Sequence, residues 1–155
     1  MIERGYLLAL RRVCGRLSDL KHPWAITGSL GLALQGVAVD IHDVDIQTDR
    51  GGAYQMERLL AGNVIKPVSF IESETIRSHF GQVELDGCRI EIIGDIEKRS
   101  ELGWDEPPRL LQIIRTIRFE DLSVPVIDLD YERNAYRSLN RIATVEAIEQ
   151  VLANL

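Results

Sequence analysis

The sequence predicts a mixed α/β (α+β) domain, with a mixed β-sheet flanked by helices and further helices at the C-terminal end. Three observations lead to this class. Strand-like and helix-like segments alternate over residues 24–60, an Asp-Gly turn joins two strand-like runs in the middle, and helical spacing returns near the end. A chain of 155 residues can bury one good core but not two ordinary ones, so we expect one domain over residues 1–155.

The first elements follow from hydrophobic spacing and from local start and stop signals. Apolar residues recur at helical intervals over residues 2–20, where Pro23 then stops the helix. The segments expected next are a strand at Trp24–Thr27, a short helix at 29–35 ending near Gly36, a strand at 43–48, a turn at 49–52 and a helix at 53–60.

The middle of the chain predicts a hairpin with strands at residues 80–84 and 88–93, because Asp86-Gly87 is a strong turn signal. Acidic residues suit a helix N-terminus, so Asp95 and Glu97 predict the start of a helix. Residues 101–108 predict a loop, in which Trp104 is interpreted as a hydrophobic plug rather than a base-stacking residue.

The last third of the chain predicts two helices after one ambiguous segment. Residues 110–119 satisfy both the helical and the strand period, so both readings stay open. Asp128 predicts the N-cap of a helix at 129–139, and Thr144 that of a last helix at 145–152. Arg115 and Arg118 could meet phosphate oxygens, although solvation or ion pairing is the preferred interpretation of each.

Composition narrows the classes of partner. The sequence is 45% hydrophobic and 27% charged, which is normal for a folded globular protein. A net charge of −6 argues against a nucleic-acid partner, which requires a broad cationic face. We find no secretion signal and no apolar run of about 18 residues, so we expect a cytoplasmic protein without a membrane partner. Cys14 and Cys88 lack metal-ligand spacing and are interpreted as packing residues.

Two aspartates one residue apart, Asp43 and Asp45, lie at the predicted second strand. Alternate residues of a strand project to the same face, so both carboxylates are expected on one side of the sheet. Like charges aimed at one point repel each other, and a cation between them removes that repulsion. Oxygen ligands without His or Cys favour Mg²⁺ or Mn²⁺. The simpler alternative is a solvent-facing pair on an edge strand.

Gly28-Ser29 follows the first strand and predicts a phosphate-binding turn. A strand that turns into a helix presents free N–H groups and the positive end of the helix dipole. Gly28 allows close approach of the backbone, and Ser29 could cap the helix and donate its hydroxyl to a phosphate. A phosphate cradle that faces paired carboxylates suits phosphoryl or nucleotidyl transfer.

Glu91 is a further candidate, because it lies among Ile90, Ile92 and Ile93 in the second strand of the hairpin. A carboxylate inside an otherwise buried strand is costly unless it is paired or bound to a cation. This residue is therefore expected to have a functional reason for its position.

These residues resemble the nucleotidyltransferase fold of the DNA polymerase beta superfamily. The resemblance rests on Gly28-Ser29 followed by Asp43-Val44-Asp45, and the small lincosamide, aminoglycoside and minimal nucleotidyltransferases are most similar. It implies that Asp43, Asp45 and Glu91 bind metal, with Glu91 as general base where many members have Asp, and that Gly28 and Ser29 bind the nucleotide. The C-terminal part departs from the usual pattern at Ala143 and Thr144, where relatives carry Lys and Asp.

The resemblance implies an enzyme that uses Mg²⁺ or Mn²⁺ to transfer a nucleoside monophosphate from an NTP, in first place ATP, to a hydroxyl of a small molecule or protein. The alternative is a catalytically weak or inactive protein of the same fold that acts through a partner, as the antitoxin of a toxin–antitoxin pair does. A nucleotide sensor without transfer activity is a third possibility. The acceptor and the oligomeric state do not follow from the sequence.

Overall fold

A computed structural model describes residues 2–155. The helices are α1 (Arg4–Arg16), α2 (Gly28–Leu34), α3 (Arg50–Leu59), the 3₁₀ turn η1 (Ala61–Asn63), α4 (Leu110–Ile113), α5 (Leu129–Ser138) and α6 (Ile142–Ala153). The strands are β1 (Trp24–Thr27), β2 (Val44–Thr48), β3 (Val64–Glu72), β4 (Ile76–Leu85), β5 (Cys88–Ser100), β6 (Gly103–Trp104), β7 (Ile114–Phe119) and β8 (Leu122–Ile127).

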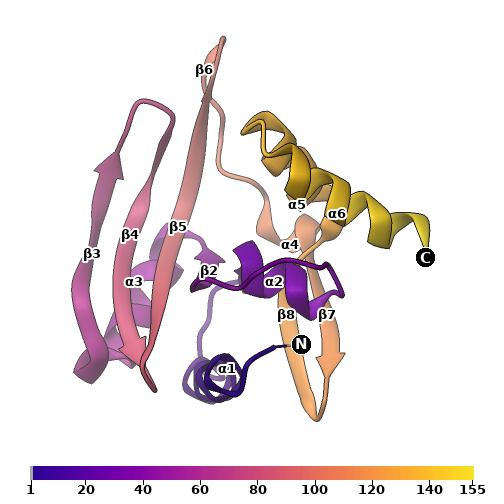
Figure 1. Cartoon of the computed structure of the whole chain (residues 1–155). Coiled ribbons are helices and arrows are strands. Elements are labelled where there is room, and N and C mark those ends of the chain that lie inside the picture. The colour runs from indigo at the N-terminus through magenta and orange to yellow at the C-terminus, as the bar shows by residue number, and fades with distance from the viewer. Residues whose placement is uncertain (1) are drawn as a thin grey trace.

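The strands form a mixed sheet in the order β3-β4-β5-β2-β1-β8-β7, and β6 pairs with β5 off this path. The pairs β2–β5 and β1–β8 are parallel, whereas β1 and β2 are antiparallel. Figure 1 shows the upper end of β5 on the same side of the molecule as α5 and α6. The predicted class, a mixed sheet flanked by helices, is confirmed.

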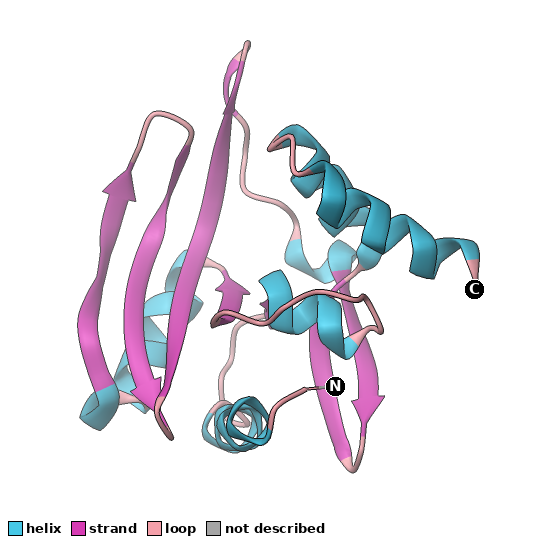
Figure 2. Ribbon diagram, viewed as in Figure 1, coloured by secondary structure: helices cyan, strands magenta, loops and turns pink. Residues whose placement is uncertain are grey.

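The two faces of the sheet have different environments. Ile26, Ile46, Ile90 and Ile92 point into the main core, together with buried residues of α1 and α3. Helix α3 packs across β3, β4 and β5 (Figure 2). Ala25 points the other way, into a small core with residues near α4 and α5. Because side chains alternate along a strand, the residues next to these isoleucines face α5.

Several elements match their predictions closely. The hairpin turns at Asp86-Gly87, β1 has the predicted bounds, and Gly36 ends α2 with a φ of +89°. Asp128 caps α5, because its side chain accepts a hydrogen bond from the Tyr131 N–H at 2.7 Å. The ambiguous segment at 110–119 contains both structures, since α4 leads directly into β7.

The turn predicted at 49–52 is wrong, because α3 already begins at Arg50. Asp49 is the N-cap, and its side chain accepts from the Gly52 N–H at 2.7 Å. Glycine is costly inside a helix but tolerable in a capped first turn. The Thr144 cap is also wrong, since α6 begins three residues earlier than predicted, at Ile142, and its N-cap residue is Arg141.

The helix start predicted at Asp95 and Glu97 is wrong as well, because β5 continues to Ser100 in pairing with β4. Asp95 lies in this strand with a φ of +48°, at an irregularity in its pairing with β4. The sequence analysis also missed β3, an edge strand whose exposed residues include Lys66 and Pro67. Its weak pattern is typical of an edge strand, where proline is tolerated.

No helix in residues 2–155 has the length and apolar character needed to cross a membrane.

Candidate active site

Three strands bring the central carboxylates together. Asp45 is the second residue of β2, which lies between β1 and β5. The register places Asp45 opposite Thr27 of β1 and opposite Glu91 of β5. Residues paired across neighbouring strands project to the same face, so these side chains lie side by side on the face that looks toward α5.

Asp45 has an unsatisfied environment. Its Oδ1 is buried and has no hydrogen-bond partner among the described residues. Burial raises the pKa of Asp45, and together with the negative charges of Glu91, Asp43 and Glu132 it brings this pKa to about 7. A buried carboxylate oxygen without a donor is costly, and a bound cation would satisfy it.

Asp43 lies immediately before β2, which begins at Val44. The prediction that strand alternation aligns it with Asp45 is therefore only approximate. Asp43 is half-buried and close enough to raise the pKa of Asp45 by its charge. On β5, Glu91 is also half-buried, and its Oε2 accepts from Gln82 Nε2 at 3.1 Å.

Gly28 fits the space beside Asp45 only because it has no side chain. Its φ is +66°, in the left-handed region, and a Cβ at this position would collide with Asp45 Oδ2. The glycine thus lets the turn from β1 into α2 lie directly against the carboxylate. The predicted close approach at this turn is present, and its neighbour is Asp45.

Ser29 does not cap α2, because Thr27 is the N-cap residue. The Ser29 hydroxyl instead accepts from the backbone N–H of His42 at 3.1 Å, which ties the turn to the segment before β2. Its hydrogen remains available to an oxygen of a ligand. Helix α2 has seven residues, so its dipole is a modest contribution to anion binding.

Glu132 of α5 is a site residue that the sequence analysis missed. It is 4% exposed, and its carboxylate accepts from Thr27 Oγ1 at 3.0 and 3.1 Å and from the Gly28 N–H at 3.2 Å. Burial raises its pKa to about 7, against the effect of these hydrogen bonds and of Lys98. Leu129, Glu132 and Tyr136 share one face at helical spacing, which was the available signal.

A cavity of about 320 Å³ lies over the carboxylates, between α5 and the strands. Its lining includes Asp45 and Gly28 from the turn region and Lys98 from β5. Tyr136 and Arg141 line this cavity and also a second one of about 220 Å³, which Ser29 borders. The Gly28-Ser29 turn therefore borders two cavities, with Gly28 in the lining of the first and Ser29 in that of the second.

In the described part of the chain, no three His, Cys, Asp or Glu side chains stand in an arrangement that could hold a metal ion as they are placed. The donor chemistry nevertheless fits a hard cation, because Asp45 Oδ1 is unsatisfied and the charges of Glu91 and Asp43 act on the same carboxyl.

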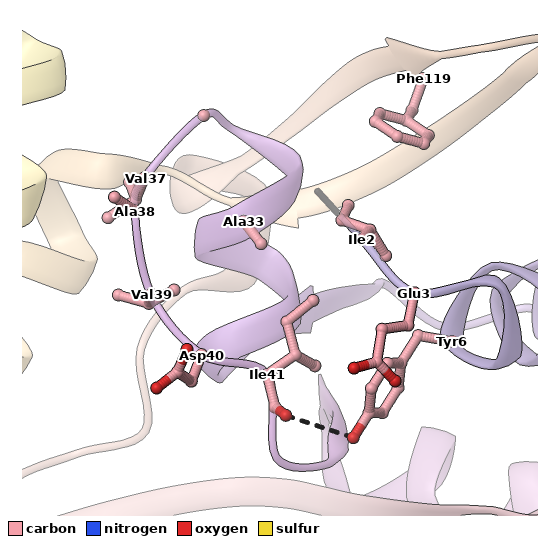
Figure 3. Close-up of a pocket in the computed structure, with 11 residues that line it drawn as sticks. Ile2, Glu3, Tyr6, Ala33, Val37, Ala38, Val39, Asp40, Ile41 and Phe119 are labelled. Atoms are coloured by element: carbon pink, nitrogen blue, oxygen red, sulfur yellow. Dashed lines mark hydrogen bonds between the residues drawn. The ribbon is translucent and has the colours of Figure 1, made fainter.

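The most voluminous of these hollows, about 740 Å³, lies elsewhere (Figure 3). It opens between the start of α1, the 37–41 segment and Phe119, and Tyr6 donates from its hydroxyl to the Ile41 carbonyl at 3.2 Å. None of the predicted site residues lines it. Its carboxylates, Glu3 and Asp40, are exposed, so it lacks the chemistry found beside Asp45.

Other candidate residues lie outside the site. Arg115 and Arg118 are exposed on β7, which is separated from β2 by β1 and β8. Trp104 is half-buried, and the Arg77 and Arg99 guanidinium carbons lie 4.4 and 5.4 Å from its ring centroid. Trp104 thus stacks with arginines at the tip of β5 instead of filling a core.

The fold and the carboxylates beside the strand–turn–helix define an enzyme of the nucleotidyltransferase class. The chain belongs to the aminoglycoside-2''-adenylyltransferase family, whose model matches residues 9–149. The predicted resemblance is thereby confirmed. No curated protein matches the chain.

Solved structures agree with this family. A candidate nucleotidyltransferase from Thermotoga maritima, TM1012, is 44% identical with a TM-score of 0.88, over 100% of this chain and 97% of that one. The lincosamide antibiotic adenylyltransferase LnuA, bound to lincomycin, shares the fold at 14% sequence identity and a TM-score of 0.59. The match covers 97% of this chain and 98% of LnuA. ANT(2")-Ia, in complex with adenylyl-2"-tobramycin, also shares the fold, at 10% sequence identity and a TM-score of 0.56. The match covers 97% of this chain and 93% of that one.

Proposed function

We propose that the protein transfers a nucleoside monophosphate from an NTP, in first place ATP, to a hydroxyl group of a small molecule. The observation that carries this proposal is the buried, unpartnered Oδ1 of Asp45, which lies beside Glu91 and against Gly28. Carboxylates gathered beside a phosphate-sized turn supply both parts of such a site. The family and the solved nucleotidyltransferases support the same reaction class.

Asp43, Asp45 and Glu91 are the residues that would hold Mg²⁺ or Mn²⁺. When bound, the ion would supply positive charge to the transferring phosphoryl oxygens and the leaving group. Ser29 would donate its hydroxyl to the β- or γ-phosphate, and Gly28 would keep the turn close to Asp45. Arg141 borders both cavities and would add a positive charge to the phosphate side.

The chemical step requires a general base on the acceptor side, and we assign this role to Glu91, which lies beside Asp45. The acceptor oxygen forms a bond to the α-phosphorus, and its proton passes to Glu91. The bond from the α-phosphorus to the oxygen that bridges it to the β-phosphorus breaks, and pyrophosphate leaves with the electron pair. Gln82 donates to Glu91 and would hold this carboxylate in place.

Calorimetric titration with ATP, with and without Mg²⁺, tests the proposal. We expect wild-type binding to require the metal, and Glu91→Gln to weaken it because one carboxylate is lost. Glu84→Gln is the matched control, since Glu84 is exposed on the neighbouring strand. Absence of ATP binding under either condition would overturn the proposal.

Turnover of a labelled NTP separates this function from the alternative, a catalytically weak protein of the same fold that binds a partner such as a toxin. Release of pyrophosphate in the presence of an acceptor supports the enzyme. Metal-dependent ATP binding without any turnover on hydroxyl acceptors would favour the partner-binding alternative.

A further inference from the structure

Lys98 joins the site face through an irregularity in β5. Glu91 and Lys98 are an odd number of residues apart, so a regular strand would point them to opposite faces. Asp95 has a φ of +48°, and the pairing of β4 with β5 shifts by one residue there, since His79 pairs with Gly94 but Arg77 with Glu97. This extra residue returns Lys98 to the face of Glu91.

The cavity lining agrees with this geometry. Ile93, Ile96 and Lys98 all border the cavity that also contains Asp45. Tyr131 and Glu132 of α5 belong to the same lining. In Figure 1 the upper end of β5 and helix α5 both lie in the upper half of the view. Lys98 therefore lines the same cavity as Asp45 and Glu132, and Glu91 lies beside Asp45 on the neighbouring strand.

The Lys98 ammonium has no hydrogen-bond acceptor or ion-pair partner within residues 2–155, and its Nζ lies 5.7 Å from the centroid of the Tyr131 ring. The side chain is half-buried. Glu132 and Asp105 act on it by charge, but Glu132 accepts from Thr27 and Gly28, while Asp105 accepts from Ser100 Oγ at 3.2 Å. Burial lowers the pKa of Lys98, so an anionic group would stabilise its charged form.

The remaining wall of the cavity is mostly apolar. Only two carboxylates line it, and Asp45 belongs to the proposed cation site while Glu132 is already hydrogen-bonded. Such a wall offers no set of free acids for a molecule with several ammonium groups. The apolar lining residues are Ile76, Ile93, Ile96, Ala135 and Leu139.

We propose that the acceptor is an amphipathic anion, with a hydroxyl that reaches Glu91, an apolar body that lies on the isoleucines, and a carboxylate that binds Lys98. This rests on the nucleotidyl transfer proposed above. Six regular strand steps of about 3.3 Å separate the two residues by roughly 20 Å between Cα atoms, and their side chains shorten this span. A flexible chain of about ten carbons is a suitable first probe.

Three probes of equal length isolate the role of the charge: ω-hydroxydecanoate, decanediol and ω-aminodecanol. All carry a hydroxyl at one end, and the other end is an anion, a neutral group or a cation. The assay measures kcat/KM for adenylyl transfer to each, with ATP and Mg²⁺ present. A charge-assisted hydrogen bond contributes about 1.5–3 kcal/mol, so we expect hydroxydecanoate to be preferred over the diol by roughly tenfold to a hundredfold.

Variants at Lys98 test whether this residue determines the preference for the anionic probe. Lys98→Met should abolish the preference for hydroxydecanoate over the diol, measured as the ratio of the two kcat/KM values. Lys98→Glu should shift the preference to aminodecanol. Lys21→Met is the matched control, because Lys21 is exposed and distant from the cavity lining.

Two results would overturn the inference. One is a loss of kcat/KM in Lys98→Met that is equal for all three probes, because such a loss would mean that Lys98 has a structural role beside Glu132. The other is calorimetric binding of hydroxydecanoate that is absent or insensitive to Lys98. ATP binding with Mg²⁺ is measured on the same protein, so failure of nucleotide binding is recognised separately as failure of the proposed function.

Discussion

Replacing Asp45 with Asn should stabilise the metal-free protein, and the gain should grow as pH rises. The folded-state pKa of Asp45, about 7, lies above its ordinary 3.8, so the folded chain holds the proton more tightly than the unfolded chain. Below about pH 4 both states are protonated and the carboxyl costs nothing. As pH rises toward 7 the ionised group increasingly opposes folding, and above 7 the cost is complete.

The pKa difference sets the size of the effect. At about 1.4 kcal/mol for each unit of pKa, the cost of ionised Asp45 reaches about 4 kcal/mol at most. Because the amide of the variant would still place a polar group where Asp45 Oδ1 has no hydrogen-bond donor, we expect a smaller gain, of about 1–3 kcal/mol, for Asp45→Asn at pH 8. At pH 4 the variant and the wild type should differ by less than about 1 kcal/mol.

Urea unfolding with a chelator present, at pH 4 and at pH 8, measures both values. Asp19→Asn, at an exposed position, controls for the general change in net charge. Added Mg²⁺ should stabilise the wild type but not Asp45→Asn, because ligand binding to the folded state raises stability. A variant less stable than the wild type at pH 8, or a gain independent of pH, would refute this reasoning.

Three further predictions follow from the same geometry. Gly28→Ala should lower the free energy of unfolding by more than about 2 kcal/mol, because of the left-handed φ and the collision with Asp45. Gly15→Ala in α1 is the control and should raise the free energy of unfolding by about 0.5–1 kcal/mol. Urea unfolding measures both values, and equal effects of the two substitutions would contradict the contact between Gly28 and Asp45. The apparent Kd for Mg²⁺ should rise about tenfold for each pH unit below 7, because the Asp45 proton competes with the metal; a pH-independent Kd in calorimetry would argue against Asp45 as a ligand. Asp95→Val should lower the melting temperature, since a β-branched residue is strained at a φ of +48°, and Asp95→Gly should not; similar melting temperatures for both would contradict the backbone argument.

The parts of the fold that local chemistry determines were predictable from the sequence. A short apolar run before Gly28 predicts β1, Asp86-Gly87 predicts the hairpin, and Asp128 predicts a cap. The resemblance assigned Gly28, Asp45 and Glu91 to one site before their positions were known. The structure places these three together through the register of neighbouring strands.

The parts that depend on distant segments were not predictable. Asp95 and Glu97 have the composition of a helix start, but pairing with β4 keeps them in a strand. Glu132 lies in the first turn of α5, where an acidic residue is explained by the helix dipole alone. Its hydrogen bonds to the β1–α2 turn require the chain to return after more than a hundred residues, which local patterns do not encode.

The two edge strands of the sheet, β3 and β7, also affect whether copies of the protein associate by strand pairing at high concentration. Pro67 has no N–H to offer a further strand, and the register irregularities of β3 near Lys66 disturb the spacing that sheet extension needs. At the opposite edge, two β7 strands from different copies could pair in an antiparallel way. This pairing would bring Arg115 and Arg118 of one copy near Arg115 and Arg118 of the other, and these like charges repel each other. Growth of a continuous sheet from chain to chain is therefore opposed at both ends, by backbone chemistry at β3 and by charge at β7.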